Sequence, residues 1–317
     1  MIKSEAQEIK KSPLVSVIIP LYNYEKYVAD CIDSIVKQDY ENIEIVLIDN
    51  ASTDNGLKIA KNKLRSCINS SIKYNIIENS QNLGICASLN LAVHAVKGEY
   101  TCIISADDLL AKGRITRHIQ ILEKSSKLNI TVCNGPIQTM KEDGTPTSKL
   151  TLLGSLGENE KFSFESVVTK KNDLTLQGCT FHTHVLKELL FDENLFYDDW
   201  DFFIRLTLHN YGIVYDELVS AHYRVKETGL ALNTVKMIES RTKIKNKYFQ
   251  IILKKNKKLA DSFVFTVDYW NLISLSYHGH VSVWIITCIK MFIKNPINMI
   301  KNLKDIAWTF RNLFRSK

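Results

Sequence analysis

Four short apolar segments that alternate with helical patterns over the first 108 residues constrain the fold of this chain more than any other feature. Each segment is rich in β-branched residues, as buried strands are. Strands are expected at residues 15–20, 43–48, 72–77 and 100–104, and helices between them at 27–38, 52–64 and 85–96. This alternation predicts an α/β fold with a Rossmann-like, mostly parallel central sheet.

Polar residues collect where these strands end, at Tyr22-Asn23, Asp49-Asn50, Asn79 and Asp107-Asp108. In open parallel sheets, ligands bind beside the carboxyl ends of the strands. The alternative is that these residues only form turns, which explains each Asn or Asp singly but not their repetition. We therefore expect a ligand site at this edge.

The turn after the first strand reads Pro20-Leu-Tyr-Asn-Tyr-Glu25, without the GxGxxG of a dinucleotide-binding oxidoreductase, and no P-loop motif occurs. A bound nucleotide would need another source of positive charge for its phosphates. The pair Asp107-Asp108 can supply one by holding Mg²⁺ or Mn²⁺. Alternatively, an Asp in this position caps the following helix.

Beyond Asp108 the alternation fades. A helix is expected at 115–128, a strand at 130–140, a hairpin turn at 142–145, an irregular stretch at 150–175, a strand at 179–183, a helix at 199–208 and an edge strand at 215–224. After about residue 235 the pattern is helical to the end.

The net charge of +7 conceals two regions of opposite sign. Residues 241–317 contain 15 Lys and Arg and 3 Asp, a net +12, whereas residues 1–240 carry a net −5. The acidic body argues against a nucleic-acid partner, and the basic tail suggests an anionic membrane surface.

The tail contains two amphipathic helical faces. Their apolar residues are Val281, Trp284, Ile285, Cys288 and Phe292 in the first, and Ile300, Leu303, Ile306, Ala307, Phe310, Leu313 and Phe314 in the second. Lys301, Lys304, Arg311 and Arg315 lie opposite the second face. Such helices suit attachment to anionic headgroups, and packing on the body is the alternative.

The seven cysteines show no CxxC pairing and lie mostly in apolar runs, which indicates buried thiols in a reducing cytosol. The first residues lack the apolar region of a signal peptide. The longest apolar run, residues 281–293, is interrupted by Lys290 and is too short to span a bilayer. A cytoplasmic protein, peripheral on the inner face of the cell membrane, is expected.

Six motifs in order resemble those of glycosyltransferase family 2, over about residues 14–225. They are Val15-Ser-Val-Ile-Ile-Pro-Leu-Tyr-Asn23, Val46-Leu-Ile-Asp-Asn-Ala-Ser-Thr-Asp54, Asn82-Leu-Gly84, Gly98-Glu-Tyr100, Ser105-Ala-Asp-Asp108 and Asp198-Asp-Trp-Asp-Phe-Phe-Ile-Arg-Leu206. The resemblance implies a GT-A fold, a nucleotide-diphosphate sugar donor, a divalent metal and inversion at the anomeric carbon.

By this resemblance, Pro20, Tyr22 and Asn23 would lie against the base and ribose, and Asp49 would accept a hydrogen bond from the pyrimidine N3–H. The same motifs place Asn50, Ser52, Gly84 and Asn90 among the nucleotide-binding residues. Many members have Asp-Asp-Gly-Ser where this chain has Asp49-Asn-Ala-Ser52. The choice between UDP and dTDP therefore stays open.

The expected metal motif departs from the common Asp-x-Asp, because Ser105 occupies the first acidic position. Ser105 can hydrogen-bond the ribose, Asp107 matches the ligand, and Asp108 is its neighbour. The cofactor implied is Mn²⁺ or Mg²⁺.

Asp199 matches the catalytic base of the family. An inverting displacement needs a carboxylate within reach of the acceptor hydroxyl, opposite the leaving diphosphate. Asp201 is a second candidate, for a contact with the diphosphate or acceptor, but it precedes Arg205 by four residues, so an ion pair along the helix is the favoured interpretation for it.

Several basic residues are candidates for contacts with the diphosphate or acceptor. The segment His222-Tyr-Arg-Val-Lys-Glu227 resembles the family's Tyr-Arg-x-His, with Lys226 in the His position. His222 and Arg224 are alternatives. His182 and His184 are expected to share one face of a strand, lining the acceptor pocket or lying on the surface.

These expectations divide the chain into a polar leader (1–13), a GT-A domain (14–232, with nucleotide-binding half 14–108 and acceptor half 109–232) and a basic helical appendage (233–317). The implied function is transfer from a UDP- or dTDP-sugar to a glycan acceptor, lipid-linked, in surface polysaccharide or lipopolysaccharide synthesis. The alternative is a non-catalytic sugar-nucleotide-binding scaffold.

Overall fold

The computed structural model describes residues 12–66, 72–125, 129–151, 162–169, 174–196, 199–226, 233–277 and 281–313. The expected polar leader lies almost entirely outside these ranges, as do Cys67, Asp198, Glu227, Phe314 and Arg315.

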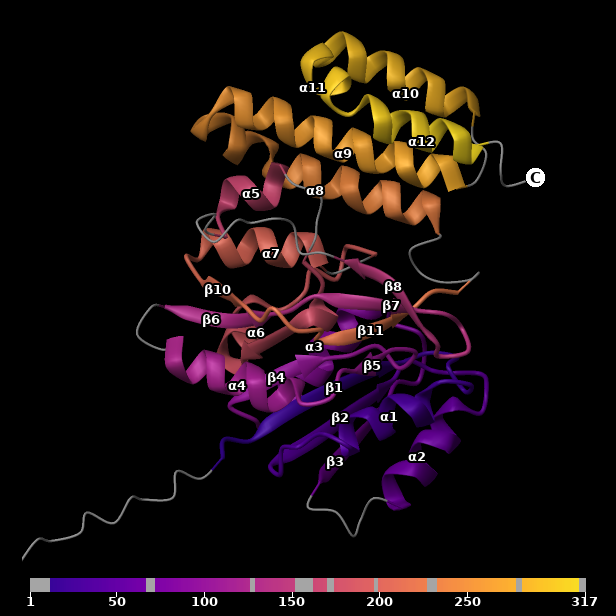
Figure 1. Ribbon diagram of the computed structural model, residues 1–317, viewed down its shortest axis with the longest axis vertical. Helices are drawn as coiled ribbons and strands as arrows, with labels where there is room; N and C mark the ends of the chain where they lie inside the picture. The colour runs from indigo at the N-terminus through magenta and orange to yellow at the C-terminus, as the bar shows by residue number, and fades with distance from the viewer. Residues whose placement is uncertain are drawn as a thin grey trace, which may run out of the picture.

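The centre of the molecule is a seven-stranded sheet in the order β10-β6-β9-β4-β1-β2-β3. Its strands are β1 Val15–Leu21, β2 Ile43–Asp49, β3 Lys73–Glu78, β4 Tyr100–Ile103, β6 Ile130–Asn134, β9 Cys179–His182 and β10 Gly212–Tyr215. Of these seven strands, β9 alone runs antiparallel to its neighbours, β4 and β6. The predicted mostly parallel α/β sheet is confirmed (Figure 1).

A second, four-stranded sheet has the order β5-β11-β7-β8. It consists of β5 Leu109–Leu110, β7 Ile137–Met140, β8 Pro146–Thr151 and β11 Ala221–Arg224. Because β5 follows Asp108 directly, this sheet adjoins the carboxyl end of β4 and brings β11 to it.

Helices cover both faces of the large sheet, and further helices follow it (Figure 1). In chain order they are α1 Val28–Val36, α2 Gly56–Ser66, α3 Ile85–Ala95, α4 Arg114–Ser125, α5 Phe164–Thr169, the 3-10 turn η2 Leu176–Gly178, α6 Thr183–Leu189, α7 Asp199–Leu208, α8 Thr234–Lys255, α9 Lys257–Tyr277, α10 Val281–Lys294, α11 Pro296–Lys301 and α12 Leu303–Leu313.

Alternate residues of the central strands enter two different cores. Val17 and Ile19 of β1 pack with α1, α2 and α4, whereas Ile18 packs with α3, α6 and α7. Both faces of the sheet are buried, which explains why its strands are continuous apolar runs and not alternating ones.

Two strands expected from sequence are each divided in the structure. The segment 130–140 breaks at Gly135-Pro136 into β6 and β7, which belong to different sheets. A Cβ at Gly135 would lie 2.0 Å from Ser220 Oγ, so only glycine permits this crossing. The segment 215–224 divides in the same way into the end of β10 and β11.

The helix expected from Ser52 begins instead at Gly56. The Asp54 carboxylate accepts a hydrogen bond from the Gly56 backbone N–H at 2.8 Å, while Ser52 Oγ accepts from the Asn23 N–H at 3.0 Å. The first-turn donor is therefore satisfied by Asp54, and Ser52 joins two loops.

The C-terminal helices form two groups. Side chains of α8 and of the first half of α9, among them Tyr248 and Phe263, belong to the same core as α7. Helices α10 to α12 pack on α9 in a separate cluster that includes Trp284 and Ile306. These two residues were expected on amphipathic faces suited to a membrane, but they are buried because α9 provides an apolar partner. None of the described helices has the length and apolar character to span a membrane.

Candidate active site at the carboxyl edge of the sheet

The strand order reverses between β1 and β4, and the ends of β1, β2 and β4 meet at one edge. Backbone hydrogen bonds join Asn50 N to Leu21 O at 2.8 Å and Ala106 N to Pro20 O at 3.3 Å. The predicted gathering of polar residues from these strand ends at one edge of the sheet is thus observed.

Asp49, the last residue of β2, holds an available acceptor at this edge. Its carboxylate is only 3% exposed; Oδ2 accepts from the Ser52 N–H at 3.1 Å, and Oδ1 has no hydrogen-bond partner within the described ranges. Burial of an unpaired carboxylate oxygen is costly unless a ligand completes it. A pyrimidine N3–H is a donor that would do so.

The loop after β1 is tied to the loop after β2. The side-chain oxygen of Asn23 accepts from the Thr53 N–H at 2.8 Å, and Asn23 itself has a left-handed φ of 57°. This tie leaves Tyr22 exposed beside the edge and Pro20 partly buried. The ring of Tyr22, which was expected to lie against the base, is thus exposed to solvent.

Asn50 holds the following loop in place. Its Oδ1 accepts from the Leu83 N–H at 2.8 Å and from Asn79 Nδ2 at 3.2 Å, and its Nδ2 donates to Asn82 Oδ1 at 2.9 Å. Gly84 has a φ of 83°, which favours glycine, and immediately precedes α3. Asn50 therefore shapes the loop whose N–H groups start this helix.

Asn90, expected among the nucleotide-binding residues, has a different position. Its Oδ1 accepts from the Phe191 N–H at 2.7 Å, and its Nδ2 donates to Phe191 O at 3.0 Å and to Glu193 at 2.9 Å. The amide is buried and joins α3 to the segment after α6. A direct contact with nucleotide is therefore not supported, because the amide is already engaged inside the fold.

Asp107 lies between a hydroxyl and an ammonium. Ser105 Oγ donates to Asp107 Oδ1 at 2.6 Å, and Lys226 Nζ lies 2.5 Å from Asp107 Oδ2. Both side chains of this ion pair are 10% exposed. Ser105 and Lys226 are therefore both at the expected site, with Lys226 paired to the carboxylate.

Asp108 and Arg224 form a buried corner behind this pair. The Arg224 backbone N–H donates to Asp108 Oδ1 at 2.8 Å, and its side chain donates to Asp107 O at 2.8 Å and Glu142 O at 2.6 Å. Burial, and then the charge of Asp107, raises the pKa of Asp108 well above its usual range. Asp108 is therefore held as a structural partner of β11.

Three tyrosines at this edge were not predicted as site residues from the sequence, two of them between β1 and α1 and the third on β11. Tyr24 and Tyr27 place their rings 4.1 and 5.3 Å from Lys226 Nζ, within cation–π range. Burial raises the pKa of Tyr24, and the charges of Asp107 and Asp108 raise it further. The closely spaced tyrosines after the first strand were the available signal, but the partner lysine is about 200 residues away in the chain.

The pKa of Tyr223, the third tyrosine, is affected by three carboxylates. Burial, and after it the charges of Asp108, Asp107 and Asp199, together raise the pKa of Tyr223 to about 12. Asp199, the first residue of α7, is therefore within electrostatic range of Tyr223, although α7 follows β4 by almost a hundred residues.

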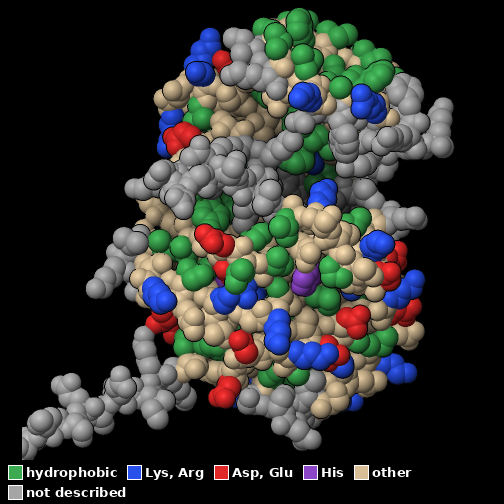
Figure 2. All heavy atoms as spheres, in the orientation of Figure 1, with side chains coloured by type: hydrophobic (Ala, Val, Ile, Leu, Met, Phe, Trp, Pro, Cys, Tyr) green, Lys and Arg blue, Asp and Glu red, His purple; other side chains and the backbone are tan. Residues whose placement is uncertain are grey.

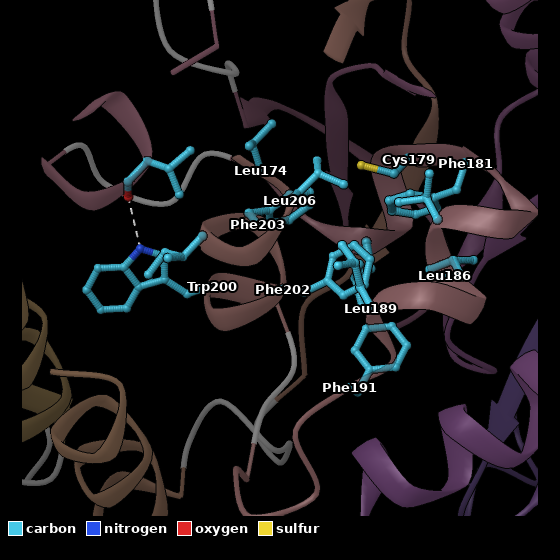
Figure 3. Close-up of a cluster of buried hydrophobic side chains, with 14 of the residues drawn as sticks. Leu174, Cys179, Phe181, Leu186, Leu189, Phe191, Trp200, Phe202, Phe203 and Leu206 are labelled. Atoms are coloured by element: carbon cyan, nitrogen blue, oxygen red, sulfur yellow. Dashed lines mark hydrogen bonds between the residues drawn. The ribbon is translucent and has the colours of Figure 1, made fainter. Parts of the chain in front are cut away.

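Helix α7 places Asp199 at its first turn, and its apolar side chains fix the helix. Phe202, Phe203 and Leu206 are fully buried, and the Trp200 indole donates to Val167 O at 2.9 Å (Figure 3). Phe202 packs edge-on against Phe181 of β9 with ring centroids 5.6 Å apart. The position of Asp199 is therefore set by rigid packing against the sheet.

Asp201 is a structural residue. It is 1% exposed and accepts hydrogen bonds from Arg205 Nε at 2.7 Å, Lys247 Nζ at 2.8 Å and Tyr248 OH at 2.7 Å. The ion pair with Arg205 expected from the spacing is confirmed. Asp201 joins α7 to α8 and is not among the residues facing the site.

The histidines expected near the acceptor are scattered. His182 pairs in register with Tyr100, the first residue of β4, and therefore lies at the opposite edge of the sheet from Asp107. His184 belongs to α6, with its ring 5.7 Å from that of His182. An acceptor pocket lined by these two residues is thus not supported. His222 lies on β11, half-buried, and burial lowers its pKa.

The residues present do not fit a resident divalent cation. Both oxygens of Asp107 are engaged, and Asp108 Oδ1 accepts from the Arg224 backbone N–H, so within the described ranges this carboxylate pair leaves a single buried oxygen, Asp108 Oδ2, without a hydrogen-bond partner. Across the described ranges, no group of three His, Cys, Asp or Glu side chains is placed to share an ion. The carboxylate and histidine expected in a metal site are replaced by Ser105 and Lys226.

Comparison with known proteins decides the family. The model of the family described as Glycosyl transferase family 2 matches residues 16–190, more than half of the chain. The chain belongs to glycosyltransferase family 2. An uncharacterized glycosyltransferase of Haemophilus influenzae is 28% identical over 96% of this chain and 99% of its own length. Glycosyltransferase GlyG of Streptococcus pneumoniae is 33% identical over 38% of each chain, so the match spans well under half of that relative.

Solved structures confirm the GT-A fold of this glycosyltransferase. The mannosyltransferase PcManGT from Pyrobaculum calidifontis, in complex with GDP-Man and Mn²⁺, has a TM-score of 0.57 and 18% identity, covering 96% of this chain and 88% of that one. S. aureus TarS 1–349, in complex with UDP-GlcNAc, has a TM-score of 0.53 and 18% identity, covering 96% and 91%.

Proposed function

We propose that this glycosyltransferase transfers a sugar from a UDP-sugar, with a dTDP-sugar as the related choice, to a glycan acceptor. The observation that carries the proposal is the buried, unpaired Oδ1 of Asp49 beside the exposed ring of Tyr22. A carboxylate only accepts hydrogen bonds, so it selects the N3–H of uracil or thymine over cytosine, which has no such donor. The UDP-GlcNAc complex of TarS is consistent with this choice.

Asp199 would act as the base of an inverting displacement. The acceptor oxygen forms a bond to the anomeric carbon, the bond from that carbon to the β-phosphate oxygen breaks, and the electron pair leaves with the diphosphate. The acceptor proton passes to Asp199. The position of Asp199 in the first turn of α7, within electrostatic range of Tyr223 on β11, supports this role.

The Mn²⁺ or Mg²⁺ expected at Asp107 and Asp108 stays a prediction. The Mn²⁺ in the PcManGT complex supports it, whereas the donor set of this chain, within the described ranges, does not. Proton transfer to Asp199 does not depend on which cation holds the diphosphate.

Asp49→Asn should weaken UDP binding and relax the choice of base. The amide can present its N–H₂ to cytosine, and the charged hydrogen bond to uracil is lost, so UDP affinity should fall about 10- to 100-fold while CDP affinity rises. Isothermal titration with UDP and CDP measures both. Asp54→Asn, at the start of α2, is the matched control and should leave the ratio unchanged. An unaltered UDP to CDP ratio in Asp49→Asn would remove Asp49 from base recognition.

We also propose that the C-terminal helices bind an anionic membrane surface, where a lipid-linked acceptor of surface polysaccharide or lipopolysaccharide synthesis would be found. The exposed apolar residues of α10 include Ile286, Ile289 and Ile293, which share one face at helical spacing. Figure 2 shows hydrophobic side chains gathered over this end of the molecule, with Lys and Arg side chains nearby. Lys290 and Lys294 on the same helix are exposed and complement anionic headgroups.

Replacing Ile286 and Ile289 together by Glu should lower binding to vesicles of phosphatidylcholine and phosphatidylglycerol by more than about tenfold, because two exposed apolar side chains that would enter the bilayer are replaced by anionic ones. Vesicle co-sedimentation measures this. Leu218→Glu, which changes an exposed leucine on the body, should have no effect. Equal binding by both variants would contradict the proposal, and a change in oligomeric state alone would indicate that a second copy covers this face.

A further inference from the structure

The positive charge that contacts the Asp107 carboxylate, at the carboxyl edge of the sheet, is an ammonium. Lys226 Nζ lies 2.5 Å from Asp107 Oδ2, in the place where the sequence pattern leads one to expect a metal between a carboxylate and a histidine. The other oxygen of Asp107 accepts from Ser105 Oγ at 2.6 Å. The carboxylate is thus fully engaged by groups of this chain.

The surroundings hold the ammonium at this point. The rings of Tyr24 and Tyr27 lie 4.1 and 5.3 Å from Nζ, and the Val225 N–H donates to Met140 O at 2.9 Å. Arg224, two residues before Lys226, is fixed by Asp107 O and Glu142 O, with its guanidinium 4.8 Å from the Tyr27 ring. A positive charge is therefore built into the edge by several independent contacts.

We propose that the Lys226 ammonium takes the place of a divalent cation in this glycosyltransferase, so that nucleotide binding and transfer do not require metal. The inference rests on the proposed function. An ammonium has three donors on a flexible stem, so it can keep one bond to Asp107 and offer others to the β-phosphate. Its charge stabilises the negative charge that the diphosphate gains as its bond to the anomeric carbon breaks.

Titration with UDP, with and without EDTA, tests this on the full chain. Wild-type protein should bind UDP equally in EDTA and in Mn²⁺. Lys226→Met, which keeps the stem and removes the charge, should lose about 10- to 100-fold in UDP affinity in both conditions. Uridine, which has no phosphate, should bind this variant as it binds wild type.

Two further variants distinguish an effect of the Lys226 charge on UDP binding from an effect on folding. Lys226→Arg should retain most of the UDP affinity, and Lys226→His should bind UDP weakly in EDTA and regain affinity in Mn²⁺, because an imidazole can ligate the ion. Lys97→Met, an exposed lysine at the other edge of the sheet, is the matched control and should behave as wild type.

The outcomes distinguish the two proposals. If wild-type protein binds UDP only in Mn²⁺, the ammonium does not replace the metal and this inference fails while the proposed function stands. If neither UDP nor dTDP binds in any condition, the proposed function fails and this inference with it.

Discussion

Asp199→Asn should lower the rate of sugar transfer by about 10²- to 10⁴-fold and leave UDP affinity unchanged. The amide has nearly the same shape as the carboxylate but cannot take the acceptor proton. Because Phe202, Phe203 and Leu206 hold α7 against the sheet, the substitution should not move the helix. Transfer is measured as acceptor-dependent UDP release, and UDP affinity by calorimetry.

The matched control for this variant is Asp192→Asn. Asp192 is also a carboxylate near α7, but its partner is Lys247 at 2.6 Å. The Asp192→Asn variant should transfer sugar at the wild-type rate. Wild-type transfer by Asp199→Asn would mean that another group is the base, and binding of UDP without any transfer by the wild-type protein would favour a non-catalytic scaffold.

Asp201→Ala should destabilise the protein by about 3–5 kcal/mol, because Arg205, Lys247 and Tyr248 would lose their common buried partner. The effect should appear as a lower urea midpoint with an unchanged slope. We expect Asp201→Ala to be less stable than wild type. The molecules that remain folded should bind UDP with wild-type affinity.

Asp192→Ala again provides the comparison, since Asp192 and Asp201 share Lys247. The Asp192 side chain is 22% exposed and that of Asp201 is 1% exposed. The more exposed ion pair, Asp192 with Lys247, should contribute at most about 1 kcal/mol to the free energy of unfolding. An equal decrease in the free energy of unfolding for the two variants would contradict the structural role assigned to Asp201.

The sheet and its ligand edge could be predicted because their signals are local. A buried strand, the polar residue that ends it and the helix that follows are neighbours in sequence, so β1, β2 and β4 and the edge residues Asp49 and Asp107 follow from the pattern. The ion pair of Asp201 with Arg205 is local for the same reason, at a separation of four residues.

Predictions for residues whose contacts are distant in the sequence were less accurate. Asn90 is engaged by Phe191 and Glu193, a hundred residues away, and His182 is carried to the opposite edge because β9 runs antiparallel to β4. The amphipathic faces of the tail were visible in the sequence, but burial of Trp284 and Ile306 depends on α9.

By itself, the sequence determined the strand and helix alternation, the family motifs and the opposite charges of body and tail, since each depends on residue types at short spacing. Only the tertiary structure decided that Asp199 comes within electrostatic range of Tyr223, that Asp201 is buried against α8, and that Lys226 pairs with Asp107. Asp107 and Lys226 are separated by more than a hundred residues, and the pairing of β11 with β5 brings them together. A contact of this kind depends on sheet pairing, which short-range pattern does not specify.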